Sequence, residues 1–437
     1  MFLVWWMSIE CAAQNVTRLY SRQQLEADAA RYGAMVDAEY RGTILPRLTA
    51  AEKDALASIK FAFPIAGPLG DPFEFYTDGR TVYLPALSLR FYADLCMAHA
   101  WLSLHGYDGT TVRDYVGLLF REASLSPRAP LPPIFKTLGV PENVRDEPAV
   151  EQRGSRNFAN TVVFILAHEL GHALRKHRAD VSDPAQSRAQ EIAADAFAIE
   201  VMRRLPQIPL GLESWFDFER IRHAAPREIP RDADWQKYLS TLRHPVTTER
   251  LTSLAIEIEK TPEAFASAQN DRALWTMRTK MFAQYFRMAA PFAGNATARV
   301  AEYSRVRDLR LSSLKPRKAG FTLPALAGGG REEDFQGFFQ IEKKSADGGT
   351  ALRCDMLLLR TGDEVGGSYS SGAADGFVEG MVEKGVLHFG WKEGAANGRG
   401  RLESSDAGAS LRGVWGNGRS EEGGGTWTGA RRSADKR

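Results

Sequence analysis

Two histidines and a glutamate are spaced for metal chemistry in the segment His168-Glu169-Leu170-Gly171-His172. Residues four apart on an α-helix lie one above the other on the same face. His168 and His172 can therefore direct two imidazoles at one zinc ion, with Glu169 beside them as general base on a water molecule. The spacing predicts metal-assisted hydrolysis with one Zn²⁺ per chain.

The segment before these histidines, residues 158–167, is apolar on nearly every side. This composition is typical of a core helix in a sizeable domain. Burying two histidines and a glutamate there would be costly unless a partner satisfied them, and a metal ion does so. The alternative is a chance occurrence of the motif on an ordinary helix, which the apolar setting disfavours.

A second helix, predicted over residues 188–204, offers a third ligand. Glu191 and Asp195 are four residues apart and share a face with an alanine-rich stripe, which would let this helix approach the histidine helix closely. We expect Glu191 to bind the metal and Asp195 to orient a ligating histidine. Asp195, Asp180 and Asp183 stay open as alternative ligands, and a solvated acidic face is the alternative to any metal role.

Together these motifs resemble the gluzincin metallopeptidases. The closest likeness is the branch that includes bacterial membrane-stress proteases and CAAX-processing zinc proteases, whose second helix reads Glu-x-x-Ala-Asp like the segment from Glu191 to Asp195. Residues 242–251 are similar to the downstream His-Pro-x-x-x-x-Arg segment of that branch. The resemblance covers residues 155–255 and implies His244 and Arg250 as active-site accessories. The spacing from His172 to Glu191 is shorter than in that branch and nearer to that of metallopeptidases that cleave repressors.

His244 and Arg250 have both a structural and a functional interpretation. Pro245 suits the first position of a helix, so His244 falls at or just before its cap, where polar residues are common. The functional interpretation has His244 reach the zinc or a tetrahedral intermediate while Arg250 counters negative charge. The remaining histidines have no such context, and we interpret them as structural or surface residues: His99, His105, His177, His223 and His388.

Residues 73–84 predict a β-hairpin with an Asp78-Gly79 turn between alternating strands. A peptidase site needs an edge against which an extended substrate backbone can bind. A strand of this hairpin could provide that edge, which requires the hairpin to lie near His168.

The global composition is that of an ordinary globular protein of two or three domains. The 437 residues are 44% hydrophobic and 25% charged, and a net charge of +2 gives no reason to expect nucleic acid as a partner. Cys11, Cys96 and Cys354 are too far apart to indicate a disulfide framework or a thiolate metal site. No apolar run approaches the length of a membrane span, so no integral membrane span is expected. Residues 1–15 resemble a truncated signal segment, which favours a periplasmic or secreted location over a cytoplasmic one.

The chain predicts an α+β protein with a helical zincin-like domain and an all-β domain. Residues 16–315 form the predicted metallopeptidase domain, 316–334 a linker and 335–432 a glycine-rich meander barrel or sandwich, since 25 of the 39 glycines follow Ala327. Helices are predicted at 17–42, 50–60, 86–105, 110–122, 158–177, 188–204, 246–260, 270–290 and 297–313. Strands are predicted at 337–341, 352–359, 376–382, 386–391, 398–402, 411–415 and 426–429.

The function that these patterns favour is a zinc-dependent endopeptidase acting on protein or peptide substrates. A glutamate beside the ligands favours catalysis, because a structural zinc closed by four ligands needs no base. The alternatives are a non-catalytic zinc-binding regulatory protein and a binding protein that acts mainly through its C-terminal domain. The sequence does not indicate the ligand of that domain.

Overall fold

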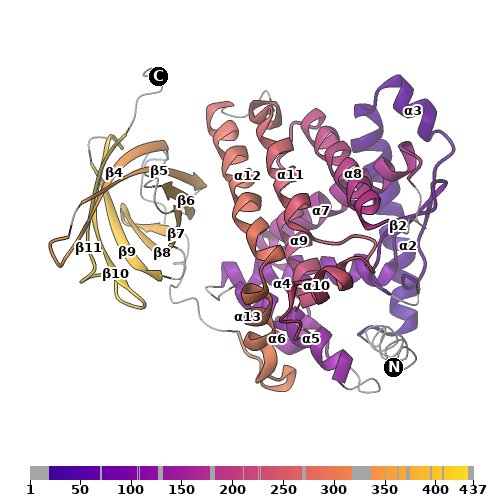
Figure 1. Cartoon of the computed structure of the whole chain (residues 1–437), viewed down its shortest axis with the longest axis horizontal. Coiled ribbons are helices and arrows are strands. Elements are labelled where there is room, and N and C mark those ends of the chain that lie inside the picture. The colour runs from indigo at the N-terminus through magenta and orange to yellow at the C-terminus, as the bar shows by residue number, and fades with distance from the viewer. Residues whose placement is uncertain are drawn as a thin grey trace. The chain divides into compact units, whose positions relative to one another are not determined.

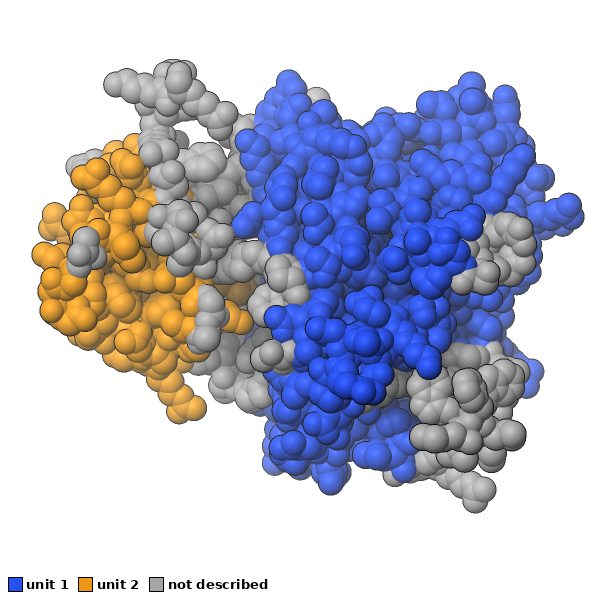
Figure 2. Space-filling view, in the orientation of Figure 1, with its two compact units in different colours: residues 1–317 blue, residues 318–437 orange. Residues whose placement is uncertain are grey.

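A computed structural model of the chain separates it into two compact units, residues 1–317 and 318–437 (Figure 2). The segment 1–15 with Cys11, the candidate Asp180, and residues 317–334 of the predicted linker lie outside the described residues. The structure describes residues 19–68, 71–105, 107, 109–125, 131–177, 183–209, 211–224, 226, 228–267, 272–316, 335, 337–349, 351–361, 364–370, 375–393, 396–405 and 408–431.

The first unit is mainly helical (Figure 1). Each predicted helix is present, whereas α6, α9 and α10 fall in segments where the sequence predicted none. The helices are α2 (Arg22–Glu39), α3 (Ala50–Leu56), α4 (Ala86–Leu104), α5 (Thr110–Leu125), α6 (Ile134–Leu138), α7 (Pro148–Leu174), α8 (Pro184–Arg204), α9 (Gly211–Ala224), α10 (Asp232–Leu239), α11 (Thr248–Glu259), α12 (Arg272–Gly294) and α13 (Ala296–Arg307).

Helix α7 is the centre of this unit. It begins ten residues before the predicted start, with Pro148 at its first turn, where a missing N–H costs nothing. Its second half is buried almost continuously from Phe158 to Ala173, because α4, α8 and α9 all pack against it. Helices α8, α11 and α12 lie side by side on one flank (Figure 1). Among the helices that the structure describes, none has the length and apolar character that a membrane span requires.

A small sheet accompanies the helices. Its strands β1 (Lys60–Ala62), β2 (Tyr76–Thr77) and β3 (Thr81–Tyr83) run in the order β1-β3-β2, with β2 antiparallel to β3 at one edge. The Asp78 Oδ1 atom accepts hydrogen bonds from the backbone of Arg80 and Thr81, and Gly79 adopts a φ of 86°. The predicted hairpin and its turn are therefore confirmed, although the strands are shorter than the alternation indicated.

The second unit is a closed barrel of eight antiparallel strands, which confirms the α+β class and selects barrel over sandwich. The prediction missed β6, because Gly366 and Gly367 interrupt its alternating pattern and read as a loop. The strands are β4 (Gly337–Ser345), β5 (Leu352–Thr361), β6 (Glu364–Ser370), β7 (Asp375–Glu383), β8 (Val386–Glu393), β9 (Ala396–Ser405), β10 (Ser410–Asn417) and β11 (Gly425–Arg431).

One end of the barrel interior combines aromatic rings with a partly buried ion pair. The Lys343 ammonium lies 2.9 Å from Glu393 Oε2, which also accepts a 2.8 Å hydrogen bond from the Tyr369 hydroxyl. The same ammonium is 4.8 Å from the ring centroids of both Trp391 and Trp415. Burial alone would raise the pKa of Glu393, but the hydrogen bonds from Lys343 and Tyr369 outweigh it and hold that pKa below its usual value.

We expect Glu393→Gln to lower the free energy of unfolding of the barrel by about 1–3 kcal/mol at pH 7, because Lys343 loses its counter-ion. A carboxylate whose folded pKa is depressed stabilises above its unfolded pKa and loses that effect as pH falls through the folded value. The difference from wild type should therefore shrink below about pH 4. Denaturant titration followed by tryptophan fluorescence measures both effects, and Glu403→Gln on the exposed side of β9 is the matched control. Equal losses in the two variants would contradict the ion-pair explanation.

Candidate metal centre

Helix α7 carries His168 and Glu169 side by side, and His172 one turn later, inside the first unit. The three residues are 0%, 1% and 8% exposed. The Nε2 atoms of His168 and His172 lie 3.1 Å apart, so both imidazoles point at the same place. The i, i+4 spacing thus produces the shared face that the sequence predicted.

Helix α8 brings Glu191 to these histidines. Its Oε1 atom is 3.2 Å from His172 Nε2, and its Oε2 atom is 3.6 Å from His168 Nε2. The two helices approach closely where Gly171 faces Ala194, since a Cβ at position 171 would lie 3.2 Å from the Ala194 backbone. The small residues Gly171 and Ala194 therefore bring α7 and α8 close enough for the Glu191 carboxylate to reach both imidazoles.

Asp195, one turn after Glu191, holds the other side of His168. Its Oδ1 atom is 2.8 Å from His168 Nδ1, so the far nitrogen of His168 is engaged and its Nε2 atom faces Glu191. Burial alone would raise the pKa of Asp195, but Arg250 and His168 outweigh it and keep the pKa below its usual value. Asp195 therefore lies behind His168 and is not among the converging groups.

Arg250 pairs with the carboxylates of both Asp195 and Glu191. It donates to Asp195 through Nε at 2.6 Å and Nη2 at 2.9 Å, and its Nη1 is 2.9 Å from Glu191 Oε2. Thr247 caps α11 by accepting the Arg250 backbone N–H, which fixes the start of the helix that carries the guanidinium. Arg250 is 2% exposed, and its guanidinium compensates the charge of the two buried carboxylates.

His244 enters the centre from the segment between α10 and α11. Its Nδ1 atom is 2.9 Å from Glu191 Oε2, and its Nε2 atom donates to the Phe75 carbonyl at 3.0 Å and lies 3.8 Å from Glu169 Oε1. Burial would lower the pKa of His244, but Glu191 outweighs it and raises the pKa to about 10. Ligand atoms of His168, His172, Glu191 and His244 all lie within 4.8 Å of one another, so this group could hold a metal ion.

The other candidates lie elsewhere. Asp183 is the exposed N-cap of α8, where it accepts a hydrogen bond from the Ala185 backbone. Among the histidines interpreted as structural or surface residues, His177 contacts a candidate ligand, with its Nδ1 atom 3.0 Å from His172 Nδ1. The contacted nitrogen is the one that points away from Glu191, so His177 lies off the metal face, behind the His172 ring. Burial lowers the pKa of His177 to about 4.

The β2–β3 hairpin lies beside the candidate metal centre, as its predicted role as an edge for substrate binding required. Phe75 directly precedes edge strand β2, and its carbonyl accepts the hydrogen bond from His244. Helix α7 also contacts β2. The hydrogen bonds of His244 to the Phe75 carbonyl and to Glu191 therefore connect three segments that are far apart in the sequence.

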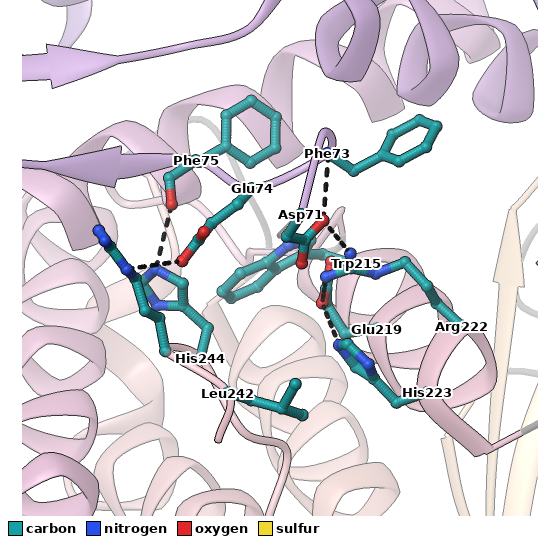
Figure 3. A pocket seen from close by; sticks show the side chains of 11 residues that line it. Asp71, Phe73, Glu74, Phe75, Trp215, Glu219, Arg222, His223, Leu242 and His244 are labelled. Carbon is teal, nitrogen blue, oxygen red and sulfur yellow. Dashed lines mark hydrogen bonds and ion pairs between the residues drawn. The ribbon is translucent and has the colours of Figure 1, made fainter. Parts of the chain in front are cut away.

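A pocket lined by charged, aromatic and aliphatic side chains opens beside His244 (Figure 3). Arg222 pairs with both Asp71 and Glu219, and His223 also lies against Glu219. The residues that line this pocket are Asp71, Phe73, Glu74, Phe75, Trp215, Glu219, Arg222, His223, Leu242, Arg243 and His244. Burial, together with Asp71, raises the pKa of Glu74 to about 7.

Sequence reasoning missed the part of this pocket that α9 supplies. Trp215, Glu219 and Arg222 lie at i, i+4 and i+7, so they share one helix face. That spacing was the available signal. It was obscured because the segment is short and mixes charged with aromatic residues.

A protein-family model described as Peptidase U49 matches residues 120–206. This range contains α7 and α8, and with them His168, Glu169, His172, Glu191 and Asp195. His244 and Arg250 lie beyond it. The match indicates a peptidase, and therefore a protein substrate. No curated protein and no solved structure matches the chain.

Proposed function

We propose that the protein is a zinc-dependent endopeptidase of the gluzincin type. The observation that carries this proposal is the convergence of His168, His172 and Glu191 with Glu169 buried beside them. Two imidazoles and one carboxylate form a ligand set that zinc uses at catalytic sites, where the fourth position stays open. The peptidase match over the same helices supports the same reaction class.

The chemistry of the donor groups fits a divalent cation. The Nδ1 atom of His168 is engaged by Asp195, so its Nε2 lone pair is available, and the His172 Nε2 atom faces the same point. Burial would raise the pKa of Glu191, but His244 and Arg250 outweigh it and hold the pKa well below its usual value, so Glu191 is ionised at neutral pH. A bound zinc ion would supply Lewis-acid polarisation of the peptide carbonyl and a water molecule of lowered pKa.

Glu169 is suited to take a proton. Its Oε2 atom is buried and has no hydrogen-bond partner among the residues that the structure describes. Such an unsatisfied acceptor is costly unless a water molecule or substrate completes it. We assign to Glu169 the role of general base that removes a proton from the attacking water.

His244 is better suited as a hydrogen-bond donor than as a fourth ligand. Both of its ring nitrogens are engaged, by Glu191 and by the Phe75 carbonyl, whereas His168 and His172 direct theirs at one point. A turn of the ring that releases the Phe75 carbonyl would let the Nε2 N–H, which lies 3.8 Å from Glu169, stabilise negative charge on the carbonyl oxygen of the intermediate. If His244 were instead a ligand, four protein groups would close the site, which is the arrangement of a non-catalytic zinc protein.

An extended substrate segment would bind along β2. This strand lies at the edge of its sheet and follows Phe75, which contacts His244. Free edge strands offer unpaired backbone groups for strand addition. The pocket beside His244 would then receive a substrate side chain next to the scissile bond.

Metal content and casein hydrolysis test the proposal together. We expect about one zinc per wild-type chain, turnover of unfolded casein, and loss of both in Glu191→Ala, because two imidazoles alone hold zinc weakly. Glu200→Ala is the matched control, since Glu200 lies on the same helix but pairs with Arg203 and Arg204 and not with the candidate ligands. Plasma emission spectrometry gives the zinc content. Zinc bound without any turnover would favour the non-catalytic alternative, and absence of zinc from the wild type would overturn the proposal.

A further inference from the structure

The end of α7 turns the chain back onto the metal centre. The Lys176 N–H donates to the Ala173 carbonyl at 3.1 Å, and the His177 N–H donates to the His172 carbonyl at 3.0 Å. These two bonds, with Lys176 at a φ of 52°, form a Schellman turn. The turn explains how His177 reaches His172, since this residue is no longer on the helix.

The turn lays the side chain of His177 against that of His172. Their Nδ1 atoms are 3.0 Å apart, and the rings meet edge to face with centroids separated by 4.9 Å. His177 therefore makes two hydrogen bonds to His172, one between their backbones and one between their rings. Lys176 occupies a left-handed conformation that glycine adopts more readily, so the turn forms despite an unfavourable residue.

A hydrogen bond between two Nδ1 atoms needs one donor and one acceptor. The Nε2 atom of His172 faces Glu191 and His168, so it must carry the lone pair if it is to bind a cation. The proton of a neutral His172 is then on Nδ1, and His177 Nδ1 accepts it. Asp195 accepts from His168 in the same way, which gives each ligating imidazole its own acceptor.

We propose that His177 is a positioning residue that fixes the tautomer and the orientation of His172 for metal binding. This inference rests on the proposed zinc site. Partners of this kind behind ligating histidines typically change metal affinity 10- to 100-fold when removed. An imidazole in that place, where a carboxylate or carbonyl is usual, makes the acceptor neutral and adds no negative charge to the centre.

Two nearly isosteric substitutions test the role. His177→Leu removes the acceptor, whereas His177→Asn retains an oxygen near the position of Nδ1. We expect zinc affinity, measured by competition with a chromophoric chelator, to fall about 10- to 100-fold in His177→Leu and to stay within about threefold of wild type in His177→Asn. The visible absorption bands of the cobalt-substituted protein should shift in the leucine variant and be restored in the asparagine variant.

The outcomes separate this inference from the proposed function. A wild type that binds no zinc overturns both. Zinc affinity in His177→Leu equal to that of wild type overturns the positioning role alone. Equal losses in both variants, with matching drops in the thermal midpoint of the metal-free protein, would show that His177 only supports the fold at the helix end.

Discussion

Glu169→Gln should retain zinc and lose peptide hydrolysis by about two to four orders of magnitude. Glutamine has the same shape as glutamate but cannot accept a proton at neutral pH, so only the transfer from water is removed. Glu169 is 1% exposed and no ligand role is assigned to it, so the ligand set is unchanged. The measurement is the initial rate of casein hydrolysis by the zinc-loaded variant, with metal content determined on the same sample.

The control for this variant is its own zinc stoichiometry together with its thermal midpoint. Retained zinc and an unchanged midpoint assign the lost activity to chemistry. Wild-type turnover by a fully loaded Glu169→Gln would contradict the assignment of Glu169 as base. Loss of zinc would instead mean that Glu169 helps to hold the metal.

Arg250→Leu should lower the free energy of unfolding of the metal-free protein by about 3–5 kcal/mol. The guanidinium makes two hydrogen bonds to Asp195 and an ion pair to Glu191, and all three groups are at most 3% exposed. Leucine leaves two buried carboxylates without their cation, and such a loss costs far more than a surface ion pair. Denaturant titration with chelator present gives the value.

Arg287→Leu is the matched control for Arg250. Arg287 pairs with Glu259 at the surface, where their side chains are 42% and 31% exposed, so its loss should cost at most about 1 kcal/mol. Zinc affinity should also fall in Arg250→Leu, because Asp195 would no longer be held against His168. A cost for Arg250→Leu no larger than that for Arg287→Leu would contradict the proposed network.

The sequence by itself determined the parts of this protein that depend on local geometry. His168 and His172 share a face because four residues make about one helical turn, wherever the helix lies. The same holds for Glu191 and Asp195 and for the Asp78 turn, whose hydrogen bonds join near neighbours. Seven of the eight barrel strands could be predicted from alternation. The exception is β6, where paired glycines hide the period.

Only the tertiary structure decided how these elements meet. The close approach of Gly171 to Ala194 places Glu191 against the histidines, and the Phe75 carbonyl finds His244 across 169 residues. No local pattern encodes such contacts, because they depend on how whole helices pack.

Arg250 and His177 show the same limit at the level of single residues. The sequence indicated Arg250 as an active-site accessory, and packing of α11 against α8 decided that its guanidinium pairs with Asp195 and Glu191. Helical periodicity put His177 off the metal face, and the Schellman turn decided that it contacts His172 from that side. Spacing therefore determined which residues share a face, and packing and chain reversal decided what each one touches.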